Sequence, residues 1–314
     1  MDLNRFRRDA AADPPFTVFE FRTFLLMPPI LVIINPTARS ERARELCRKI
    51  EHLSPRAYVR ITNGPGEAQA LAHQAVTEGY ERVVAAGGDG TINEVVNGIA
   101  GSRTALGLLP LGTMNVFATE LKLPVGNLRK CWDIIEHGHV KAVDLLRAND
   151  RHFVQLAGIG FDAQIVAATS FDFKKALGPL SYIISATQIA SKKPPLLSVR
   201  GGGGTREGSF VMIGNGRYYG GPFVLFKEAR IDDGMLDVLI FKNLGYLDIV
   251  RYFQAIMLGT HTALKDVEYF QTAQVRVTST EAVPVEADGD VIGTLPVSFK
   301  VVPKGLRVMI PRGA

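Results

Sequence analysis

The chain has 314 residues, enough for one large or two ordinary domains. Hydrophobic residues make up 46% of it and charged residues 21%, which argues against a wholly disordered protein. The net charge of +5 is compatible with an anionic membrane surface, a nucleotide or a nucleic acid, and equally with an ordinary solvated surface. Two distant cysteines make no disulfide framework, which fits a reducing cytoplasm. No uninterrupted apolar run approaches the roughly 20 residues of a membrane span.

The first 28 residues are predicted to form an extension that precedes the fold. Three arginines come before an aromatic stretch at 16–26, which Glu20 and Arg22 interrupt. A signal peptide has a longer uncharged apolar core, so we expect a loosely ordered extension. The alternative is an interfacial anchor whose phenylalanines face lipid.

From residue 30 onward, short apolar runs alternate with helix-like stretches. This pattern predicts a parallel sheet with helices on its faces. Ligands of such sheets bind at the carboxyl ends of the strands, where the polar loops NPTAR, GGDGT and LGT all occur. The predicted strands are 30–34, 57–62, 82–86 and 105–110, and the predicted helices are 41–53, 67–79, 92–100 and 114–123.

After about residue 146 the apolar runs become shorter and are separated by turn signals such as Asn215-Gly216 and Asp233-Gly234. This spacing predicts a mostly antiparallel β-sandwich, interrupted by helices near 176–191 and 246–258. The glycine run at 201–204 is predicted to be a hairpin tip. We therefore expect an α/β N-terminal domain at 29–146 and a β-rich domain at 147–314, and we leave open that the last strand returns to the first domain.

The GGDGT loop at 87–91 joins an apolar strand to an amphipathic helix. Free backbone N–H groups and the helix dipole favour an anion at such a junction. An aspartate fits there if Mg²⁺ lies between the Asp89 carboxylate and the phosphates of a nucleotide. The alternative is a structural Asp turn. No P-loop lysine follows, and the spacing is not that of a dinucleotide-binding GxGxxG.

The helix after the loop is predicted to begin with a capping box, in which Thr91 caps the N-terminus and Glu94 reaches back to it. Four apolar residues then recur at helical spacing and predict one buried face: Ile92, Val95, Val96 and Ile99.

Two stretches of the first half, GGDGTINEVVNG (87–98) and LPLGTMNVFA (109–118), together with NPTAR, resemble the diacylglycerol kinase catalytic domain. The second half adds LAGIGFDA (156–163), ARIDDGMLDV (229–238) and ADGDVIGTLP (287–296). The chain thus resembles bacterial lipid kinases of the diacylglycerol kinase and YegS-like type, which are related to sphingosine and ceramide kinases. GGDGT alone is shared with NAD kinases and phosphofructokinases, whereas six motifs in order, from about residue 29 to the C-terminus, are a specific signal.

The resemblance implies a set of ATP-binding positions at the strand ends. Each is a backbone donor or small side chain whose alternative role is a cap or a turn. Arg39 stands where the family often has glycine. The implied positions are Asn35, Pro36, Thr37, Ala38, Arg39, Thr62, Gly87, Gly88, Asp89, Gly90, Thr91, Ile92, Asn93 and Thr113.

The resemblance also implies a general base and a second metal site in the β-rich half. The family has a glutamate as base where this chain has Asp290, one methylene shorter, with Asp288 as a candidate to share the role and Asp89 to act through Mg²⁺. The alternative for Asp-Gly-Asp is a hairpin turn. The implied structural Mg²⁺ site uses the side chain of Asp233 and the carbonyls of Arg230 and Met235.

The implied reaction is Mg²⁺-dependent transfer of the γ-phosphate of ATP to a lipid hydroxyl. Expected partners are ATP and a lipid at the inner face of the membrane, with the protein cytoplasmic and peripheral, no nucleic acid, and an open oligomeric state that includes a homodimer. The stretch 171–186, with Lys174 and Lys175 near its start and Lys192 and Lys193 after its end, is either a lipid-facing surface or a core helix with a solvated polar end. Two alternatives stay open: a soluble-substrate kinase of the NAD kinase superclass, and a non-catalytic protein that binds nucleotide or lipid.

Overall fold

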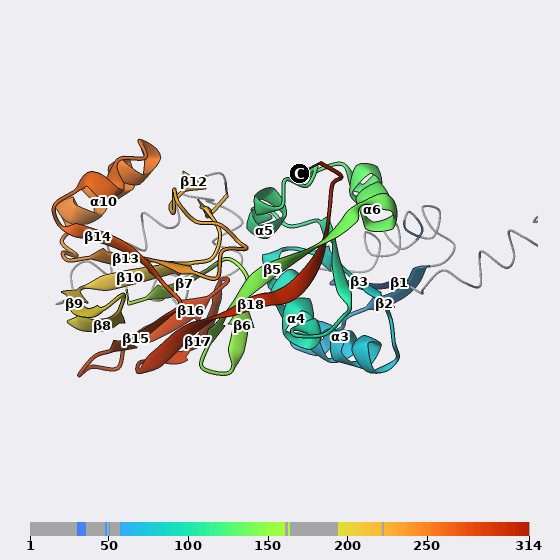
Figure 1. The fold of residues 1–314 in the computed structure, drawn as a ribbon, viewed down its shortest axis with the longest axis horizontal. Helices are drawn as coiled ribbons and strands as arrows, with labels where there is room; N and C mark the ends of the chain where they lie inside the picture. The colour runs from blue at the N-terminus through green and yellow to red at the C-terminus, as the bar shows by residue number, and fades with distance from the viewer. Residues whose placement is uncertain are drawn as a thin grey trace, which may run out of the picture.

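The computed structural model describes residues 30–35, 57–160, 194–221 and 223–313, together with Arg48, Ile50 and Ala163. The predicted extension, the NPTAR loop after Asn35 and the predicted helix at 176–191 lie outside these residues. The described chain forms two lobes that lie side by side along the longest axis of the molecule (Figure 1).

The first lobe is a parallel sheet covered by helices on both faces. Its strand order is β2 (Ala57–Ile61), β1 (Ile30–Ile34), β3 (Arg82–Gly87), β4 (Ala105–Pro110). Helices α3 (Glu67–Thr77) and α4 (Asp89–Ile99) cover one face, and α6 (Leu128–His137) covers the other. The predicted apolar face of α4 is buried between α3 and the sheet, as expected.

The second lobe is an antiparallel sandwich. One sheet has the order β14 (Val267–Thr272), β13 (Leu236–Phe241), β10 (Phe210–Gly214), β7 (Leu156–Ile159), β16 (Pro284–Ala287), β17 (Asp290–Thr294). It packs on a layer that contains β15 (Gln274–Thr278), β8 (Leu197–Gly201) and β9 (Gly204–Gly208). The predicted combination of an α/β domain with a β-sandwich is therefore confirmed, as is the hairpin tip at 201–204.

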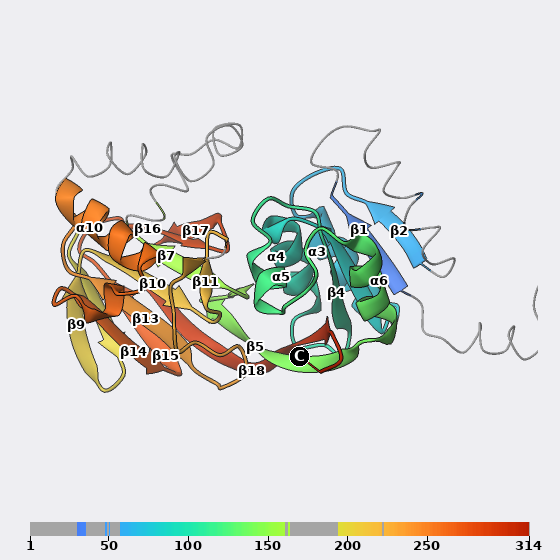
Figure 2. The same cartoon turned by 90° about the horizontal axis from the view of Figure 1, so that it is seen from above.

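Two long strands, β5 (His139–Ala148) and β18 (Val297–Ile310), pair with each other and run from one lobe into the other (Figure 2). Residues 297–310 thus form one continuous strand, although two shorter apolar runs can be read within them. Its C-terminal half pairs with β4 in the first lobe and its N-terminal half with β15 in the second.

The register of β18 shifts between Val302 and Leu306, where Lys304 has a φ of 53°. Buried Asp144 of β5 holds this bulge, because its Oδ1 accepts the Lys304 N–H at 2.7 Å. Its Oδ2 accepts the Gly234 N–H, also at 2.7 Å. One carboxylate therefore ties β18 to the loop that precedes β13.

Helix α10 (Tyr246–Met257) lies on the outer face of the six-stranded sheet, where a helix was predicted. Tyr252 packs against the stacked rings of Phe210 and Phe241, whose centroids are 4.1 Å apart. Smaller elements complete the lobe: β6 (Arg151–Phe153), β11 (Tyr218–Tyr219), β12 (Phe223–Val224) and the 3-10 turn η2 (His261–Ala263).

Asp237 of β13 is a buried carboxyl that should make stability depend on pH. Burial raises its pKa to about 6, although hydrogen bonds from Tyr269 and Gln271 oppose the shift. The unfolded chain loses this proton near pH 4. Between about pH 4 and pH 6 the folded protein therefore binds more protons, and this group makes stability fall as pH rises.

We expect Asp237→Asn to remove a destabilisation on the order of 2–3 kcal/mol at pH 7 and none at pH 4. The asparagine keeps an acceptor for Tyr269 and Gln271 but does not ionise. Urea unfolding of both proteins at several pH values measures the difference. A stability difference that does not change with pH would contradict the buried charge.

Candidate active site

Four loops meet at the carboxyl edge of the parallel sheet. The backbone N–H and the hydroxyl of Thr62 both donate to the carbonyl of Ile34, at 2.8 and 3.3 Å. The Asn35 N–H donates to the carbonyl of Ala86 at 3.2 Å, and the Leu111 N–H donates to that of Gly87 at 2.8 Å. The predicted ATP-binding positions Asn35, Thr62, 87–93 and exposed Thr113 are thus brought together at one edge.

The two glycine loops touch through their backbones. A Cβ on Gly112 would lie 2.6 Å from Cα of Gly88, and a Cβ on Gly87 would lie 2.4 Å from Oγ1 of Thr91. Side chains at these positions would push the loops apart. The glycines therefore fix the spacing of the site.

We expect Gly112→Ala to lower the free energy of unfolding by about 1–3 kcal/mol, because the added methyl group overlaps backbone. Gly90→Ala is the matched control, since a Cβ there meets nothing within 4 Å. Urea unfolding measures both variants. Equal stability of the two would contradict the close contact of the loops.

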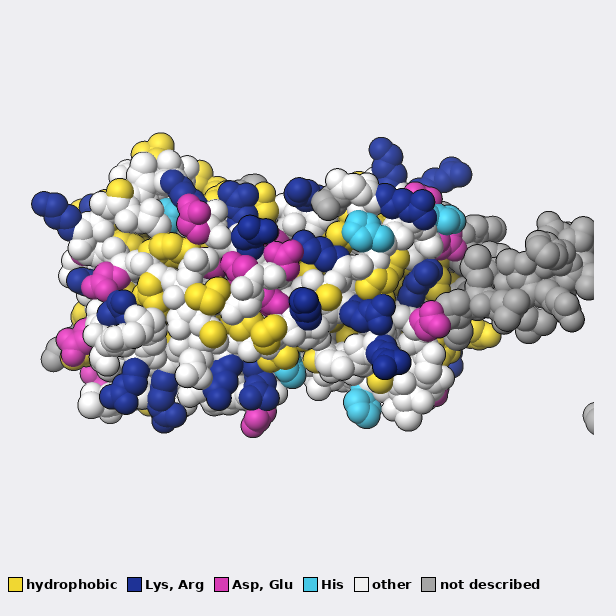
Figure 3. All heavy atoms as spheres, viewed as in Figure 1, with side chains coloured by type: hydrophobic (Ala, Val, Ile, Leu, Met, Phe, Trp, Pro, Cys, Tyr) yellow, Lys and Arg dark blue, Asp and Glu magenta, His cyan; other side chains and the backbone are white. Residues whose placement is uncertain are grey.

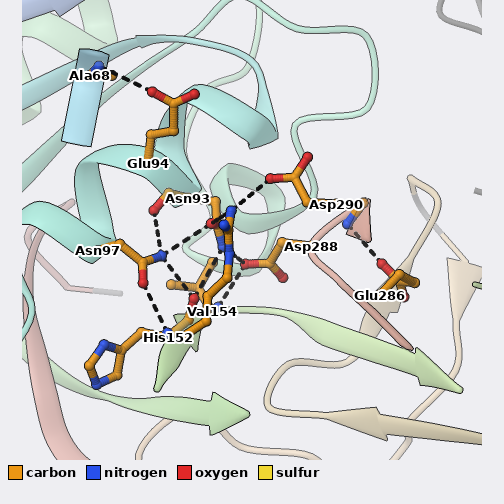
Figure 4. Close-up of polar contacts among 11 residues, drawn as sticks. Ala68, Asn93, Glu94, Asn97, His152, Val154, Glu286, Asp288 and Asp290 are labelled. Carbon is orange, nitrogen blue, oxygen red and sulfur yellow. Dashed lines mark hydrogen bonds and ion pairs between the residues drawn. The ribbon is translucent and has the colours of Figure 1, made fainter. Parts of the chain in front are cut away.

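The predicted capping box is wrong. Helix α4 already begins at Asp89, with Gly88 as its N-cap, so Thr91 lies inside the first turn, buried over Gly87. Glu94 instead accepts the Ala68 N–H at 3.1 Å, at the start of α3, which has no side-chain cap of its own. The capping residue thus acts on the neighbouring helix (Figure 4).

Asp89 joins the two glycine loops. Its Oδ1 accepts the N–H of Val116 at 2.9 Å, at the first residue of α5 (Val116–Glu120). Burial and then the charge of Asp288 raise the pKa of Asp89, while backbone N–H groups at the start of α5 lower it. Two carboxylates from different lobes therefore repel each other beside the predicted phosphate loop.

A polar network joins α4 to the second lobe (Figure 4). Buried Asn93 donates its Nδ2 to Asp288 at 2.8 Å, and its Oδ1 accepts from Arg151 at 3.2 Å and from Asn97 at 3.1 Å. Asn97 also exchanges two 2.9 Å hydrogen bonds with the backbone of His152. The side chain of Asn93 is thus engaged between the lobes, and its predicted contact with ATP stays a prediction.

Asp288 accepts four hydrogen bonds and forms the left-handed corner of the β16–β17 turn, with a φ of 48°. Its Oδ1 accepts from the N–H groups of Gln155 and Leu156, and its Oδ2 from Val154 and Asn93, at 2.8–3.1 Å. A carboxylate has about four acceptor sites. In this arrangement Asp288 has no site left for the proton of an acceptor hydroxyl, so the geometry gives it a positioning role.

Asp290, the first residue of β17, is bound differently. Its side chain is 49% exposed, and its Oδ2 forms a 2.8 Å ion pair with Arg151 of β6. Among the described residues, Arg151 is its one side-chain donor, so other lone pairs stay open to an acceptor hydroxyl. Arg151, which also reaches Asn93, escaped the sequence reasoning because no motif contains it.

The predicted metal turn lies at the start of β13. The Oδ1 of Asp233 accepts the N–H of Met235 at 3.0 Å, and the side chain of Arg230 is largely exposed. No group of three or more His, Cys, Asp or Glu within the described ranges is placed to hold a metal ion. A metal ion held by the side chain of Asp233 and by the backbone carbonyls of Arg230 and Met235 stays a prediction.

Comparison with known proteins decides the family. A family model of the diacylglycerol kinase catalytic domain matches residues 29–148, and a model of the YegS C-terminal NAD kinase beta sandwich-like domain matches 156–310. A protein of Staphylococcus carnosus named diacylglycerol kinase is 30% identical over 90% of this chain and 94% of its own length. The chain belongs to the diacylglycerol kinase family. It is therefore a kinase, a transferase of phosphoryl groups.

One further curated relative and one solved structure are similar to nearly the whole of this diacylglycerol kinase family member. The diacylglycerol kinase of Bacillus subtilis is 28% identical over 90% of the chain and 96% of its own length. The crystal structure of a diacylglycerol kinase from Bacillus anthracis superposes with a TM-score of 0.75 at 23% identity, and the match covers 91% of this chain and 97% of the other. This last likeness shows the fold.

The donors of the site fit Mg²⁺, which usually takes one or two carboxylates and completes its shell with water and substrate phosphates. The repulsion between Asp89 and Asp288 supplies a negative potential that a cation would relieve. Asp89 is the residue that would hold the ion, directly or through water.

Within the part of the chain that the structure describes, no helix has the length and hydropathy of a membrane-spanning segment.

Proposed function

We propose that this kinase transfers the γ-phosphate of ATP to the hydroxyl of a diacylglycerol-like lipid, with Mg²⁺ as cofactor. The observation that carries the proposal is the placement of Asp290. Arg151 holds this carboxylate beside Asn93 of α4, the helix that opens at the GGDGT loop. One arginine thus links the proposed proton acceptor of the second lobe to the helix that starts at the proposed phosphate-binding loop.

ATP would bind at the carboxyl edge of the parallel sheet. The N-terminus of α4, which has no side-chain cap, would offer the N–H groups of its first turn and the positive end of its dipole to the phosphates. Thr62, Asn35 and Thr113 border the same edge. Mg²⁺ held through Asp89 would neutralise charge that develops on the transferred group.

Asp290 would act as the general base. The carboxylate takes the proton of the lipid hydroxyl while the hydroxyl oxygen forms a bond to the γ-phosphorus. The bond from the γ-phosphorus to the bridging oxygen breaks, and ADP leaves with that electron pair. Arg151 and Asp288 position the turn, and the Asn93 and Asn97 contacts keep the two lobes in register for this step.

The lipid acceptor is supported by relatives named diacylglycerol kinase along nine-tenths of the chain. The test is transfer of labelled γ-phosphate from ATP to a lipid extract in detergent micelles, resolved by chromatography. We expect a labelled lipid that disappears when EDTA removes Mg²⁺ and returns when Mg²⁺ is restored. Label in a water-soluble product would indicate a soluble acceptor. ATP binding without any labelled product would indicate a regulatory protein.

A further inference from the structure

A glutamate at the end of α5 reaches from the first lobe into the second. The Oε2 atom of Glu120 accepts the backbone N–H of Arg217 at 2.7 Å and the side-chain Nε2 of Gln155 at 3.3 Å. Gln155 is 5% exposed, and its Nε2 also donates to the carbonyl of Tyr218 at 3.0 Å. This contact is separate from the network around Asn93, so it joins the lobes at a second point.

The second lobe is shaped to receive this carboxylate. A Cβ on buried Gly216 would lie 2.6 Å from Oε2 of Glu120 and 2.5 Å from Nε2 of Gln155, so glycine leaves room for the two side chains to meet. Figure 2 shows α5 and β11 facing each other where the lobes meet, and Figure 3 shows acidic and basic side chains together at this junction. Lobes that meet through polar groups move relative to each other unless specific contacts hold them.

Both ends of this contact lead to the proposed reaction. Helix α5 has only five residues, and the N–H of its first residue donates to the carboxylate of Asp89 at 2.9 Å. At about 1.5 Å per residue, the two ends of α5 are roughly 6 Å apart. The backbone N–H of Gln155 donates to Asp288 at 3.0 Å, in the turn that precedes Asp290. The side chain of Glu120 thus completes a chain of contacts from the proposed Mg²⁺ ligand to the proposed base.

We propose that Glu120 is a positioning residue for phosphoryl transfer, which sets the spacing between the nucleotide loops and the turn that carries Asp290. The inference rests on the proposed function, because it concerns the alignment of the proposed base with the proposed nucleotide site. The reach of the side chain matters more than its charge, because a single oxygen, Oε2, accepts both hydrogen bonds. The amide oxygen of a glutamine can take its place, whereas the carboxylate of an aspartate ends one methylene short.

The first test is steady-state kinetics of three variants of the full chain. We expect Glu120→Ala and Glu120→Asp to lower kcat about 10–10²-fold, since a misplacement of about 1 Å can cost that much. The KM for ATP should not change, because Glu120 is not among the implied ATP-binding positions. Glu120→Gln should stay within about fivefold of the wild type, because neutral hydrogen bonds replace charged ones at the same reach. An aspartate variant that turns over faster than the glutamine variant would make charge the decisive property and overturn the proposal.

Two further variants separate positioning from a general loss of folded protein. The matched control is Glu81→Ala, which removes an exposed carboxylate of the same lobe and should leave kcat unchanged. On the Asp290→Asn background, Glu120→Ala should lower kcat by less than about twofold, because the glutamate acts through a base that is already lost. Losses that multiply in the double variant would give Glu120 a purely structural role.

Hydrogen exchange tests the contact without turnover, in the absence of ATP and lipid. The amides of residues 154–156 donate to Asp288, and we expect Glu120→Ala and Glu120→Asp to speed their exchange about tenfold while strand β3 exchanges as before. Equal exchange of residues 154–156 in the wild type and Glu120→Ala would overturn the proposal. A wild type that shows the expected difference but transfers no phosphate would count against the proposed function alone.

Discussion

Asp290→Asn is expected to lower kcat by about 10²–10⁴-fold and to leave the KM for ATP nearly unchanged. Asparagine cannot accept the proton of the acceptor hydroxyl, and Asp290 is not one of the positions that the family resemblance implies for ATP binding. Steady-state kinetics with varied ATP and varied diacylglycerol separate the two constants. The folded state is expected to survive, because the side chain is half exposed and is held by one surface ion pair.

Two variants make this result specific. Asp290→Glu restores the residue type that the family uses and should keep measurable turnover, whereas Glu281→Gln removes an exposed carboxylate elsewhere in the same lobe and should have no effect. The loss caused by Arg151→Ala should not add to that of Asp290→Asn, because the arginine acts through the carboxylate. Full activity of Asp290→Asn would place proton acceptance on another group.

Asp89→Asn is expected to reduce kcat/KM by about 10²–10³-fold without reducing stability. The amide keeps an acceptor for the Val116 N–H but loses the charge that would hold Mg²⁺ against the phosphates. The substitution also ends the repulsion from Asp288, so the free energy of unfolding should stay equal or rise. Kinase assays and urea unfolding of the same preparation measure both quantities.

A second variant, Asp89→Ala, separates the structural role of the side chain from the role of its charge. It loses the cap of α5 as well as the charge, so it should be about 0.5–2 kcal/mol less stable than Asp89→Asn while equally inactive. Wild-type activity of Asp89→Asn would leave the aspartate with a purely structural role at the junction of the two loops.

The βα half of the fold could be read from the sequence because its signals are local. Short apolar runs, each followed by a helical period, place β1 to β4 and the amphipathic α4 without knowledge of contacts between distant residues. The phosphate-binding edge follows from the same pattern, since carboxyl ends of parallel strands share an edge. The resemblance of six motifs, in the same order as in the family, then indicated the family, which no single glycine loop could have done.

The missed features depend on contacts across the two lobes. Nothing local distinguishes Asn93 as a nucleotide contact from Asn93 as a link to Asp288 and Arg151, which lie at least 58 positions away. The bulge at Lys304 resembles a turn between two strands until Asp144 is seen to hold it. Helix α4 begins at Asp89 rather than after Thr91, and its N-cap Gly88 lies against Gly112 of the other glycine loop, a contact that the local sequence does not reveal.

The position of β18 has a consequence for synthesis of the chain. Residues 307 and 308 of β18, which pair with β4, lie about 200 residues after β4 in the sequence and are therefore synthesised much later. At about 5–20 residues per second, the unfinished first lobe waits roughly 10–40 seconds with the β4 edge open. Open edges recruit strands from other chains. A nascent chain that stops before β18 therefore lacks a strand in both lobes. Neither lobe can complete its sheet until this last fourteen-residue strand has been made.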